Sequence, residues 1–280
     1  MNTTSPSASL RGRLFAALAI FLCLMSVSAR LAVARAVLDF DGDGKTDYAV
    51  DAINSDDHKI FWYVAQSSGG VLAQQFGVSD LNAGLYDLII PEDYDGDGKC
   101  DIAVFRRGAP LMLYVLASRT NTFQATPFSG YNNLNLTQDF DGDGQADPTE
   151  AYYELGSPNL IWRTLESRTG NLRRVHFGNF YTDRPLKGDF DGDGRADLAV
   201  YRNHTGTPAN TFFVLRSSDG GIQAQTFGTA QTDYTIDSSD FDGDGKTDFA
   251  VRRSYGTGTN GNWYWIESST GAYRSLSFGT

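Results

Sequence analysis

Short apolar runs, separated by turn-forming residues, recur along most of the chain. The strongest are rich in aromatic and β-branched residues: Phe61-Trp62-Tyr63-Val64, Leu113-Tyr114-Val115-Leu116, Ile161-Trp162-Arg163-Thr164, Thr211-Phe212-Phe213-Val214 and Trp263-Tyr264-Trp265-Ile266. In four of the five cases a shorter run such as Ile102-Ala103-Val104 stands about ten residues earlier. Runs of this length and composition predict β-strands and are too short for helices.

A turn signal follows each aromatic run in the same register. It begins at Ser67, Ser118, Ser167, Ser217 and Ser268, and three residues later stands a glycine, or Asn121 in the second copy. Both residue types tolerate the left-handed conformation of a tight hairpin. A further strand then leads to Phe76-Gly77 and its counterparts, with Phe128-Ser129 in the second copy. With one strand entering ahead of it, each unit is expected to contain four antiparallel strands.

One nine-residue acidic loop opens each unit. It reads Asp39-Phe-Asp-Gly-Asp-Gly-Lys-Thr-Asp47 in the first copy and begins again at Asp93, Asp139, Asp189 and Asp240, with aspartates at positions one, three, five and nine. Four carboxylates this close repel one another unless a hard cation lies between them, and Ca²⁺ accepts six to eight oxygen ligands in flexible geometry. The glycines at positions four and six allow the sharp turn around an ion. About five bound calcium ions are predicted.

The spacing of the loops predicts the architecture. Their first aspartates stand 54, 46, 50 and 51 residues apart. A unit of about 50 residues buries too little surface to be stable alone, and tandem four-stranded units of this length are typical of β-propellers. We expect an all-β fold with one domain over residues 31–280, a β-propeller of five blades with one calcium loop each. The approximate repeats are 31–80, 81–130, 131–180, 181–230 and 231–280.

The N-terminal segment has the character of a secretory signal. Arg11 and Arg13 precede an apolar run from Leu14 to about Val27, too short for a membrane span. Residues 1–36 are therefore interpreted as a signal peptide, cleaved after Ala29 or after Ala36, with a single membrane anchor as the alternative. The predicted location is secreted, extracellular or at the cell surface, with the periplasm as a further alternative, and no membrane span remains after cleavage. The mature chain then keeps only Cys100 and has no intrachain disulfide.

The acidic balance is explained by the loops. The net charge is −11 with 34 acidic residues, of which 20 are loop aspartates. Cleavage after Ala36 leaves a net charge of −15, which five calcium ions would bring to −5. The low isoelectric point therefore indicates metal ligation. No basic run of the kind that nucleic-acid-binding proteins carry is present, so no nucleic-acid partner is expected.

The order of loop, Tyr-Ala-Val, Trp-Tyr-Val, Ser-Ser-Gly-Gly and Gln-Phe-Gly resembles the FG-GAP and VCBS repeats. That family forms the propeller of integrin α-subunits and occurs in many secreted bacterial proteins. The resemblance covers nearly all of the mature chain and implies one Ca²⁺ in each loop between the first two strands of a blade. It also implies four carboxylate ligands and one backbone carbonyl per loop: Asp39, Asp41, Asp43, Asp47 and Lys45; Asp93, Asp95, Asp97, Asp101 and Lys99; Asp139, Asp141, Asp143, Asp147 and Gln145; Asp189, Asp191, Asp193, Asp197 and Arg195; Asp240, Asp242, Asp244, Asp248 and Lys246.

Two units depart from the pattern. In the third, Pro148-Thr149-Glu150 follows the loop, so that Asp139 to Glu150 also satisfies the EF-hand spacing, which would place a helix on each side. The flanks offer no amphipathic helix, which favours the propeller interpretation, and Glu150 is left open as an extra ligand. In the first unit, Val33 replaces the aspartate or asparagine found six or seven residues before the other loops. Cleavage after Ala36 would remove most of its entering strand, so ring closure stays open.

The expected function is a non-enzymatic binding or adhesion module in which calcium is structural. His58, His176 and His204 are scattered over different units and provide no convergent catalytic set, although a carboxylate pair of the glycosidase type is a less favoured alternative. In this family the face opposite the calcium loops consists of links between strands and blades, and here it carries Tyr86, Arg106, Arg107, Tyr131, Tyr152, Tyr181, Arg202, His204, Arg253 and Tyr255. Tyrosine and arginine are enriched at binding hot spots. An extracellular protein is the first expected ligand, and a glycan, as for a propeller-type lectin, is the alternative.

Overall fold

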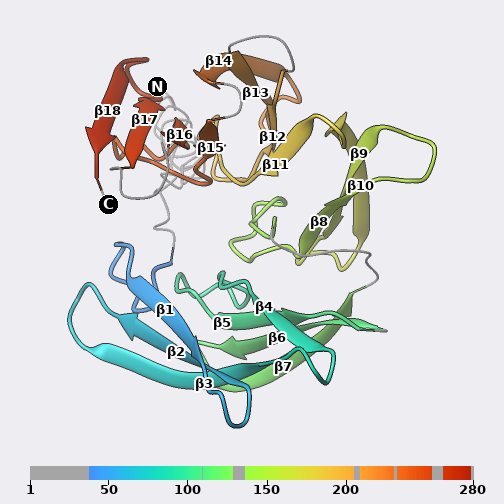
Figure 1. Cartoon of the computed structure of the whole chain (residues 1–280), viewed down its shortest axis with the longest axis vertical. Coiled ribbons are helices and arrows are strands. Elements are labelled where there is room, and N and C mark those ends of the chain that lie inside the picture. The colour runs from blue at the N-terminus through green and yellow to red at the C-terminus, as the bar shows by residue number, and fades with distance from the viewer. Residues whose placement is uncertain are drawn as a thin grey trace, which may run out of the picture. The chain divides into compact units, whose positions relative to one another are not determined.

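The computed structural model describes residues 38–108, 110–128, 136–204, 209–229, 232–253 and 261–278. Every regular element in these residues is a β-strand, and all the strand pairs are antiparallel (Figure 1). The all-β expectation is therefore confirmed. The predicted signal segment 1–36 lies outside the described residues.

Each repeat supplies a set of strands in chain order. Repeat 1 contains β1 (Tyr48–Ile53), β2 (Lys59–Ala65) and β3 (Val71–Asp80). Repeat 2 contains β4 (Leu85–Ile89), β5 (Ile102–Arg106), β6 (Leu111–Ala117) and β7 (Thr122–Phe128). Repeat 3 contains β8 (Thr149–Tyr152), β9 (Asn159–Leu165) and β10 (Leu172–Asn179). Repeat 4 contains β11 (Asp183–Leu186), β12 (Leu198–Arg202), β13 (Ala209–Leu215) and β14 (Ile222–Thr229). Repeat 5 contains β15 (Asp233–Thr235), β16 (Phe249–Arg253), β17 (Asn262–Ile266) and β18 (Tyr273–Ser277).

Repeats 2, 4 and 5 show the expected four strands, and in each the acidic loop joins the first strand to the second. In repeats 1 and 3 three strands are described, because the residues up to 37 and residues 129–135 lie outside the described part of the chain. A short pairing of Ser79 with Tyr86 and of Asp80 with Leu85 links repeats 1 and 2 into a seven-stranded sheet.

The third repeat keeps the sheet in spite of Pro148. Strand β8 begins directly after this proline and pairs with β9, Thr149 lying opposite Thr164. The Pro148 carbonyl accepts a hydrogen bond from Leu165 N–H at 2.9 Å, so the missing proline N–H costs no ladder bond within the strand. A strand after the loop is incompatible with the EF-hand alternative, which requires a helix there.

The apolar core consists of four clusters, and each lies between two consecutive repeats. Phe40 and Trp62 of repeat 1 pack with Ile102 and Val104 of repeat 2, for example, and Phe190 and Phe212 of repeat 4 with Phe249 of repeat 5. The other two clusters join repeats 2 and 3 and repeats 3 and 4. Each small sheet therefore buries its apolar side chains against the sheets of the adjacent repeats.

Backbone hydrogen bonds connect successive acidic loops in the same way. The N–H of position eight in one loop donates to the carbonyl of position one in the preceding loop. The four bonds are Cys100 to Asp39 at 2.6 Å, Ala146 to Asp93 at 2.7 Å, Ala196 to Asp139 at 2.7 Å and Thr247 to Asp189 at 2.6 Å. The loops are thus joined in series, from the first to the fifth.

Candidate metal centres

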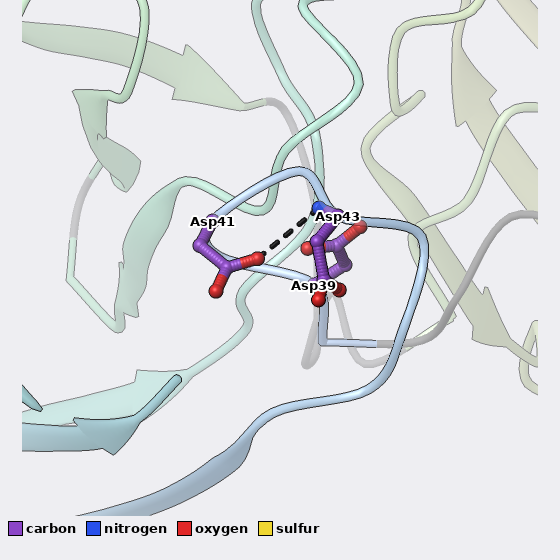
Figure 2. A group of neighbouring side chains, drawn as sticks. All are labelled: Asp39, Asp41 and Asp43. Atoms are coloured by element: carbon purple, nitrogen blue, oxygen red, sulfur yellow. Dashed lines mark hydrogen bonds between the residues drawn. The ribbon is translucent and has the colours of Figure 1, made fainter. Parts of the chain in front are cut away.

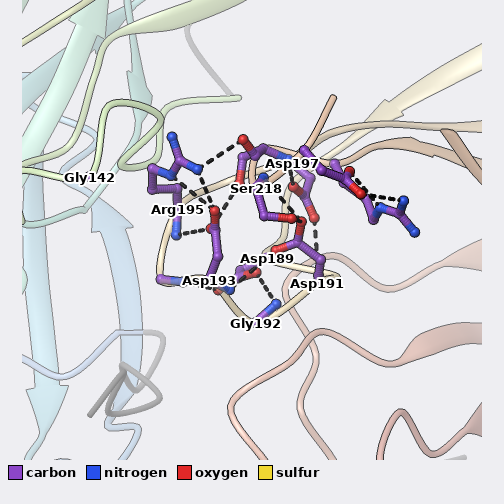
Figure 3. A network of polar contacts seen from close by, with 12 residues as sticks. Gly142, Asp189, Asp191, Gly192, Asp193, Arg195, Asp197 and Ser218 are labelled. Carbon is purple, nitrogen blue, oxygen red and sulfur yellow. Dashed lines mark hydrogen bonds and ion pairs between the residues drawn. The ribbon is translucent and has the colours of Figure 1, made fainter. Parts of the chain in front are cut away.

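The fourth loop shows how the sequence builds its acidic turn (Figure 3). Asp189 accepts hydrogen bonds from Gly192 N–H at 2.6 Å and Gly194 N–H at 2.8 Å, one on each carboxylate oxygen. Both glycines have positive φ, at 78° and 85°, which explains why glycine stands at positions four and six. Asp197 closes the loop by accepting from Phe190 N–H at 2.7 Å. Equivalent bonds recur in the other four loops.

Three carboxylates converge in every loop. Each offers one oxygen, and the three oxygens lie within 4.8 Å of one another. In repeats 2 to 5 the groups are formed by positions one, three and nine: Asp93, Asp95, Asp101; Asp139, Asp141, Asp147; Asp189, Asp191, Asp197; Asp240, Asp242, Asp248. In repeat 1 the group is Asp39, Asp41 and Asp43 (Figure 2). The structure therefore brings together three of the four predicted carboxylate ligands of each loop.

The remaining carboxylates are held by other partners. Position five in repeats 2 to 5 accepts hydrogen bonds from the backbone and from a serine, and Asp193 also binds Arg195 Nε at 3.0 Å. Asp47, the ninth position of repeat 1, accepts from Phe40 N–H at 2.8 Å and Ser67 N–H at 2.7 Å. Ligation by the carbonyl at position seven stays a prediction.

The serine turn proves to be part of the same centre, which the sequence analysis did not foresee. Its N–H donates to the position-nine carboxylate in all five repeats at 2.6–2.7 Å: Ser67 to Asp47, Ser118 to Asp101, Ser167 to Asp147, Ser217 to Asp197 and Ser268 to Asp248. Its hydroxyl donates to the position-five carboxylate at 2.7–3.0 Å. The next residue's N–H reaches position three at 3.1–3.3 Å. The spacing from loop to serine, 28 residues in four repeats and 25 in the second, was the available signal.

The donor set fits a hard divalent cation. Asp95 Oδ1 and Asp141 Oδ1 are buried and accept no hydrogen bond, which is costly for a carboxylate oxygen, and Arg168 Nε lies 3.9 Å from Asp141 Oδ1. Burial, with the neighbouring Asp141 carboxylate adding to it, raises the pKa of Asp147 to about 6. Burial likewise raises the pKa of Asp197 to about 6, with Asp191 and Asp189 contributing. A cation among these oxygens would relieve both penalties.

Glu150 is not one of the three carboxylates that converge in loop 3. Its carboxylate forms a buried ion pair with Arg163, whose guanidinium also lies over the rings of Tyr152 and Phe128. Three carboxylates of loop 3 converge without it. A partner of Glu150 therefore comes from strand β9.

The arginines expected on the ligand-binding face carry out a structural task. Arg106 binds Asp87 through two hydrogen bonds of 2.6 and 2.7 Å, Arg202 binds Asp183 through two of 2.7 Å, and Arg253 binds Asp233. The three aspartate side chains are fully buried, while each guanidinium is partly exposed. Each aspartate also accepts an N–H from the end of the preceding repeat, from Val78, Asn179 and Thr229.

Electrostatics favour these pairs. Burial opposes ionisation of Asp183, but hydrogen bonds from Arg202, Thr182 and Asn179 outweigh it and hold the pKa of this carboxyl below its usual value. The hydrogen bond to Asp87 raises the pKa of Arg106. Each guanidinium also covers an aromatic ring: Arg106 over Tyr114 at 4.8 Å, Arg202 over Phe213 at 4.6 Å and Arg253 over Tyr264 at 4.9 Å. Each pair lies within one repeat, and the aspartate reaches the preceding repeat through the N–H that it accepts.

The other residues expected on that face are placed differently from one another. Tyr181 and Tyr86 are exposed, Arg107 is exposed on the loop after β5, and Tyr152 is buried beneath Arg163. His204 is partly buried and lies 3.2 Å from the Thr211 hydroxyl. Tyr131 and Tyr255 lie outside the described residues.

A polar pocket of about 350 Å³ lies where repeats 4 and 5 meet. Residues from the ends of β11, β12, β13 and β15 line it, among them Tyr181, Arg184, Tyr201, Asn203, Asn210 and Tyr234. Burial raises the pKa of Tyr201 to about 12, so this phenol is neutral and can donate a hydrogen bond at neutral pH. Asn210 is buried, and Tyr181 and Tyr234 are exposed.

Residues 189–251 match the family model described as the FG-GAP-like repeat. This chain carries an FG-GAP-like repeat. The FG-GAP-like segment begins at the first aspartate of loop 4 and ends within β16, so it includes two of the five acidic loops. The loop contacts of this segment recur in the other repeats, as described above.

No curated protein sequence matches the chain. Among solved structures, AofleA from Arthrobotrys oligospora is 12% identical, with a TM-score of 0.47 over 83% of this chain and 69% of that one. An oligogalacturonate lyase in complex with manganese is 12% identical, with a TM-score of 0.41 over 81% of this chain and 76% of that one. These likenesses carry no argument about function.

Within the described part of the chain, no helix has the length and apolar character that a bilayer crossing needs.

Proposed function

We propose that the protein is a secreted calcium-binding β-propeller of five blades that acts as a non-enzymatic binding module, with the ions in a structural role. One observation carries the proposal: three converging carboxylates, at positions one, three and nine in four repeats and at one, three and five in repeat 1, occur five times beside the same serine turn. The four clusters of apolar residues between consecutive sheets support the propeller arrangement.

The ions would stabilise the blades by joining parts of each repeat that are distant in sequence. The loop precedes the second strand of a blade, whereas the serine turn follows the third. The carboxylates at positions three, five and nine contact both segments, so an ion bound to them holds the loop against the hairpin. Without a cation, their mutual repulsion acts against the same contacts. Calcium is proposed over magnesium because a crowded set of carboxylate oxygens replaces water, which Mg²⁺ gives up reluctantly.

Chelation tests the structural role. The secreted protein is prepared with Ca²⁺, its bound ions are counted, and its thermal unfolding is followed with and without a chelator. We expect about five ions per chain and a melting temperature that falls by roughly 15 °C or more on chelation, because each ion that binds only the folded state stabilises it. An unchanged melting curve would refute structural calcium.

A pair of substitutions locates the effect in the loops. Asp141→Asn removes a charge from a buried oxygen that has no hydrogen bond, and we expect one ion fewer and a lower melting temperature. Asp56→Asn makes the same chemical change on an exposed turn and should alter neither value. Equal effects of the two variants would contradict the assignment of loop 3 as a metal centre.

The proposed ligand is an extracellular protein or a glycan that contacts the face opposite the loops. The pocket between repeats 4 and 5 favours the second candidate, a carbohydrate-binding lectin, since aromatic faces and fixed amide and hydroxyl groups are suited to a neutral sugar. A glycan array in the presence of Ca²⁺ tests it. Binding that Tyr234→Ala abolishes and Tyr273→Ala on the outer strand β18 preserves would establish the lectin function. No binding would leave the protein ligand as the proposal.

A further inference from the structure

Two contacts recur at all four junctions between consecutive repeats, and another, made by an aromatic ring, recurs at three of them. The aromatic residue at position two of a loop packs near the first strand residue after the next loop: Phe40 with Ile102, Phe140 with Leu198, and Phe190 with Phe249, whose ring centroids are 5.3 Å apart. The three phenylalanines are 4–6% exposed. In repeat 2 the position is Tyr94, whose hydroxyl donates to the Ile90 carbonyl.

A second contact covers the glycine at position four. The side chain at position seven of the next loop lies across it, so that an added Cβ would meet Lys99 at 3.0 Å, Gln145 at 2.9 Å, Arg195 at 2.8 Å and Lys246 at 2.7 Å. Figure 3 shows Arg195 of loop 4 beside Gly142 of loop 3. The third contact is the backbone hydrogen bond from position eight to position one described above.

Among the described residues, this junction surface of repeat 5 has no partner. We call it the trailing face and define it by the Asp240 carbonyl, Phe241, Gly243, Trp263 and Trp265. Phe241 is 43% exposed, unlike the buried phenylalanines at the equivalent position. Among the described residues, no atom lies within 4 Å of a Cβ placed on Gly243. The equivalent hydrogen bond, from Thr46 N–H to the Asp240 carbonyl, is not formed.

Repeat 1 presents the complementary surface, which also has no partner in the part of the chain that the structure describes. Its leading face consists of Lys45, Thr46, Tyr48, Val50 and Tyr63. Tyr48 is 84% exposed and Val50 65% exposed, whereas Phe249 and Val251, which occupy these two positions in repeat 5, are 7% and 1% exposed. The Lys45 side chain is 72% exposed. Large apolar side chains on a strand that is buried in the other repeats indicate a surface that binds a partner.

We infer that the chain closes its own ring by docking the trailing face of repeat 5 on the leading face of repeat 1. The junction would repeat the other four: Phe241 on Tyr48, the Lys45 side chain across Gly243, and Thr46 N–H bound to the Asp240 carbonyl. The inference rests on the propeller architecture of the proposed function. It requires no exchange of a strand between the first and last repeats.

Contacts between repeats two places apart favour this chain over a second copy as the partner. Lys187 of repeat 4 forms an ion pair with Glu92 of repeat 2, and Gln138 of repeat 3 donates to the Ser238 hydroxyl of repeat 5 at 2.8 Å. In a ring of five, repeats two places apart face each other across the centre, and the fifth stands next to the first. These two contacts therefore show that the series of repeats curves in the way that a five-membered ring needs.

Amide hydrogen exchange in the calcium-loaded secreted protein tests the closure. Thr46 N–H should be protected to within about tenfold of Cys100 N–H and Thr247 N–H, its counterparts at two existing junctions, with a monomeric mass by light scattering at every concentration used. Exchange of Thr46 as fast as an unprotected amide would overturn the inference. Protection that rises with concentration together with a dimeric mass would also overturn it, in favour of a second copy.

A matched pair of double variants connects the protection to the two faces. Phe241→Ser with Val50→Ser should lower the protection of Thr46 at least tenfold while Cys100 keeps its own. Leu172→Ser with Ile222→Ser changes two similarly exposed residues on the outer strands β10 and β14, away from both faces, and should leave both amides unchanged. Loss of protection in the second pair, or none in the first, would contradict the docking surface.

Ions counted in the same samples separate the two proposals. Five bound ions with an unprotected Thr46 would refute closure and leave the calcium-binding function standing. A protected Thr46 without bound ions would refute the calcium proposal and support closure.

Discussion

The two ends of each repeat differ in how strictly they recur. At the loop end, the hydrogen bond from the serine N–H to the position-nine aspartate measures 2.6 or 2.7 Å in all five repeats. At the opposite end, the buried aspartate and its arginine are present in repeats 2, 4 and 5, while Ala52 and Tyr152 replace the arginine in repeats 1 and 3. The demands of a metal site explain the first end, and the variation of the second leaves room for a ligand.

Among the predictions, the largest loss of stability is expected when the Asp183–Arg202 pair is broken. Arg202→Ala would leave the fully buried Asp183 carboxylate without its cation, and we expect a loss of roughly 3 kcal/mol in the free energy of unfolding. Chemical denaturation measures it. Arg216→Ala breaks a more exposed pair with Asp219 and should cost less than about 1 kcal/mol. Similar losses for the two variants would show that the buried pair contributes no more than a surface one.

Acid should weaken the strictly repeated end. Because Asp147 and Asp197 have pKa values of about 6 without metal, protons compete with the cation below that pH. Calcium affinity in repeats 3 and 4 should fall about tenfold per pH unit below pH 6, measured by titration calorimetry. In the metal-free protein the sign is opposite: the raised pKa values favour folding at low pH, and this contribution is lost between about pH 4 and pH 6 as the pH rises. An affinity that does not vary between pH 5 and pH 7 would contradict this assignment.

The serine turn offers the smallest and most specific test. Ser217→Ala removes the hydroxyl bond to Asp193 at 2.8 Å but keeps the backbone bond to Asp197. We expect a loss of about 1 kcal/mol in unfolding free energy and weaker binding of one calcium ion. Ser55→Ala on an exposed turn is the control. If both variants bind calcium equally well, the serine hydroxyl does not support the metal centre.

Much of the fold could be predicted because its signals are local. The run Phe61–Val64 lies within β2, Ile102–Val104 within β5, and Trp263–Ile266 within β17, as their β-branched and aromatic residues indicate. Pro148 departs from the pattern of the other repeats, and strand β8 begins directly after it. The local pattern did not show that the proline stands outside the ladder.

Part of the candidate site could not be predicted, because its contacts join residues far apart in sequence. The arginines expected to face a ligand bind buried aspartates and stay partly exposed, and the sequence signal for this pairing was present but unused. Asp87, Asp183 and Asp233 stand six or seven residues before their loops, and each of these repeats, and no other, has an arginine thirteen residues after the loop begins. The pairing becomes evident only when adjacent strands place the two side chains together.

The sequence by itself determined the number of repeats, the β-strands and the acidic loops, since each of these depends on residues within about ten positions of one another. The tertiary structure decided which carboxylates converge, that the serine turn contacts each acidic loop, and that the junction residues of the first and fifth repeats are exposed. Those features depend on how sheets pack against each other. Each of the five loops is specified by nine consecutive residues, whereas the hydrogen bonds that connect the loops in series form only in the folded chain.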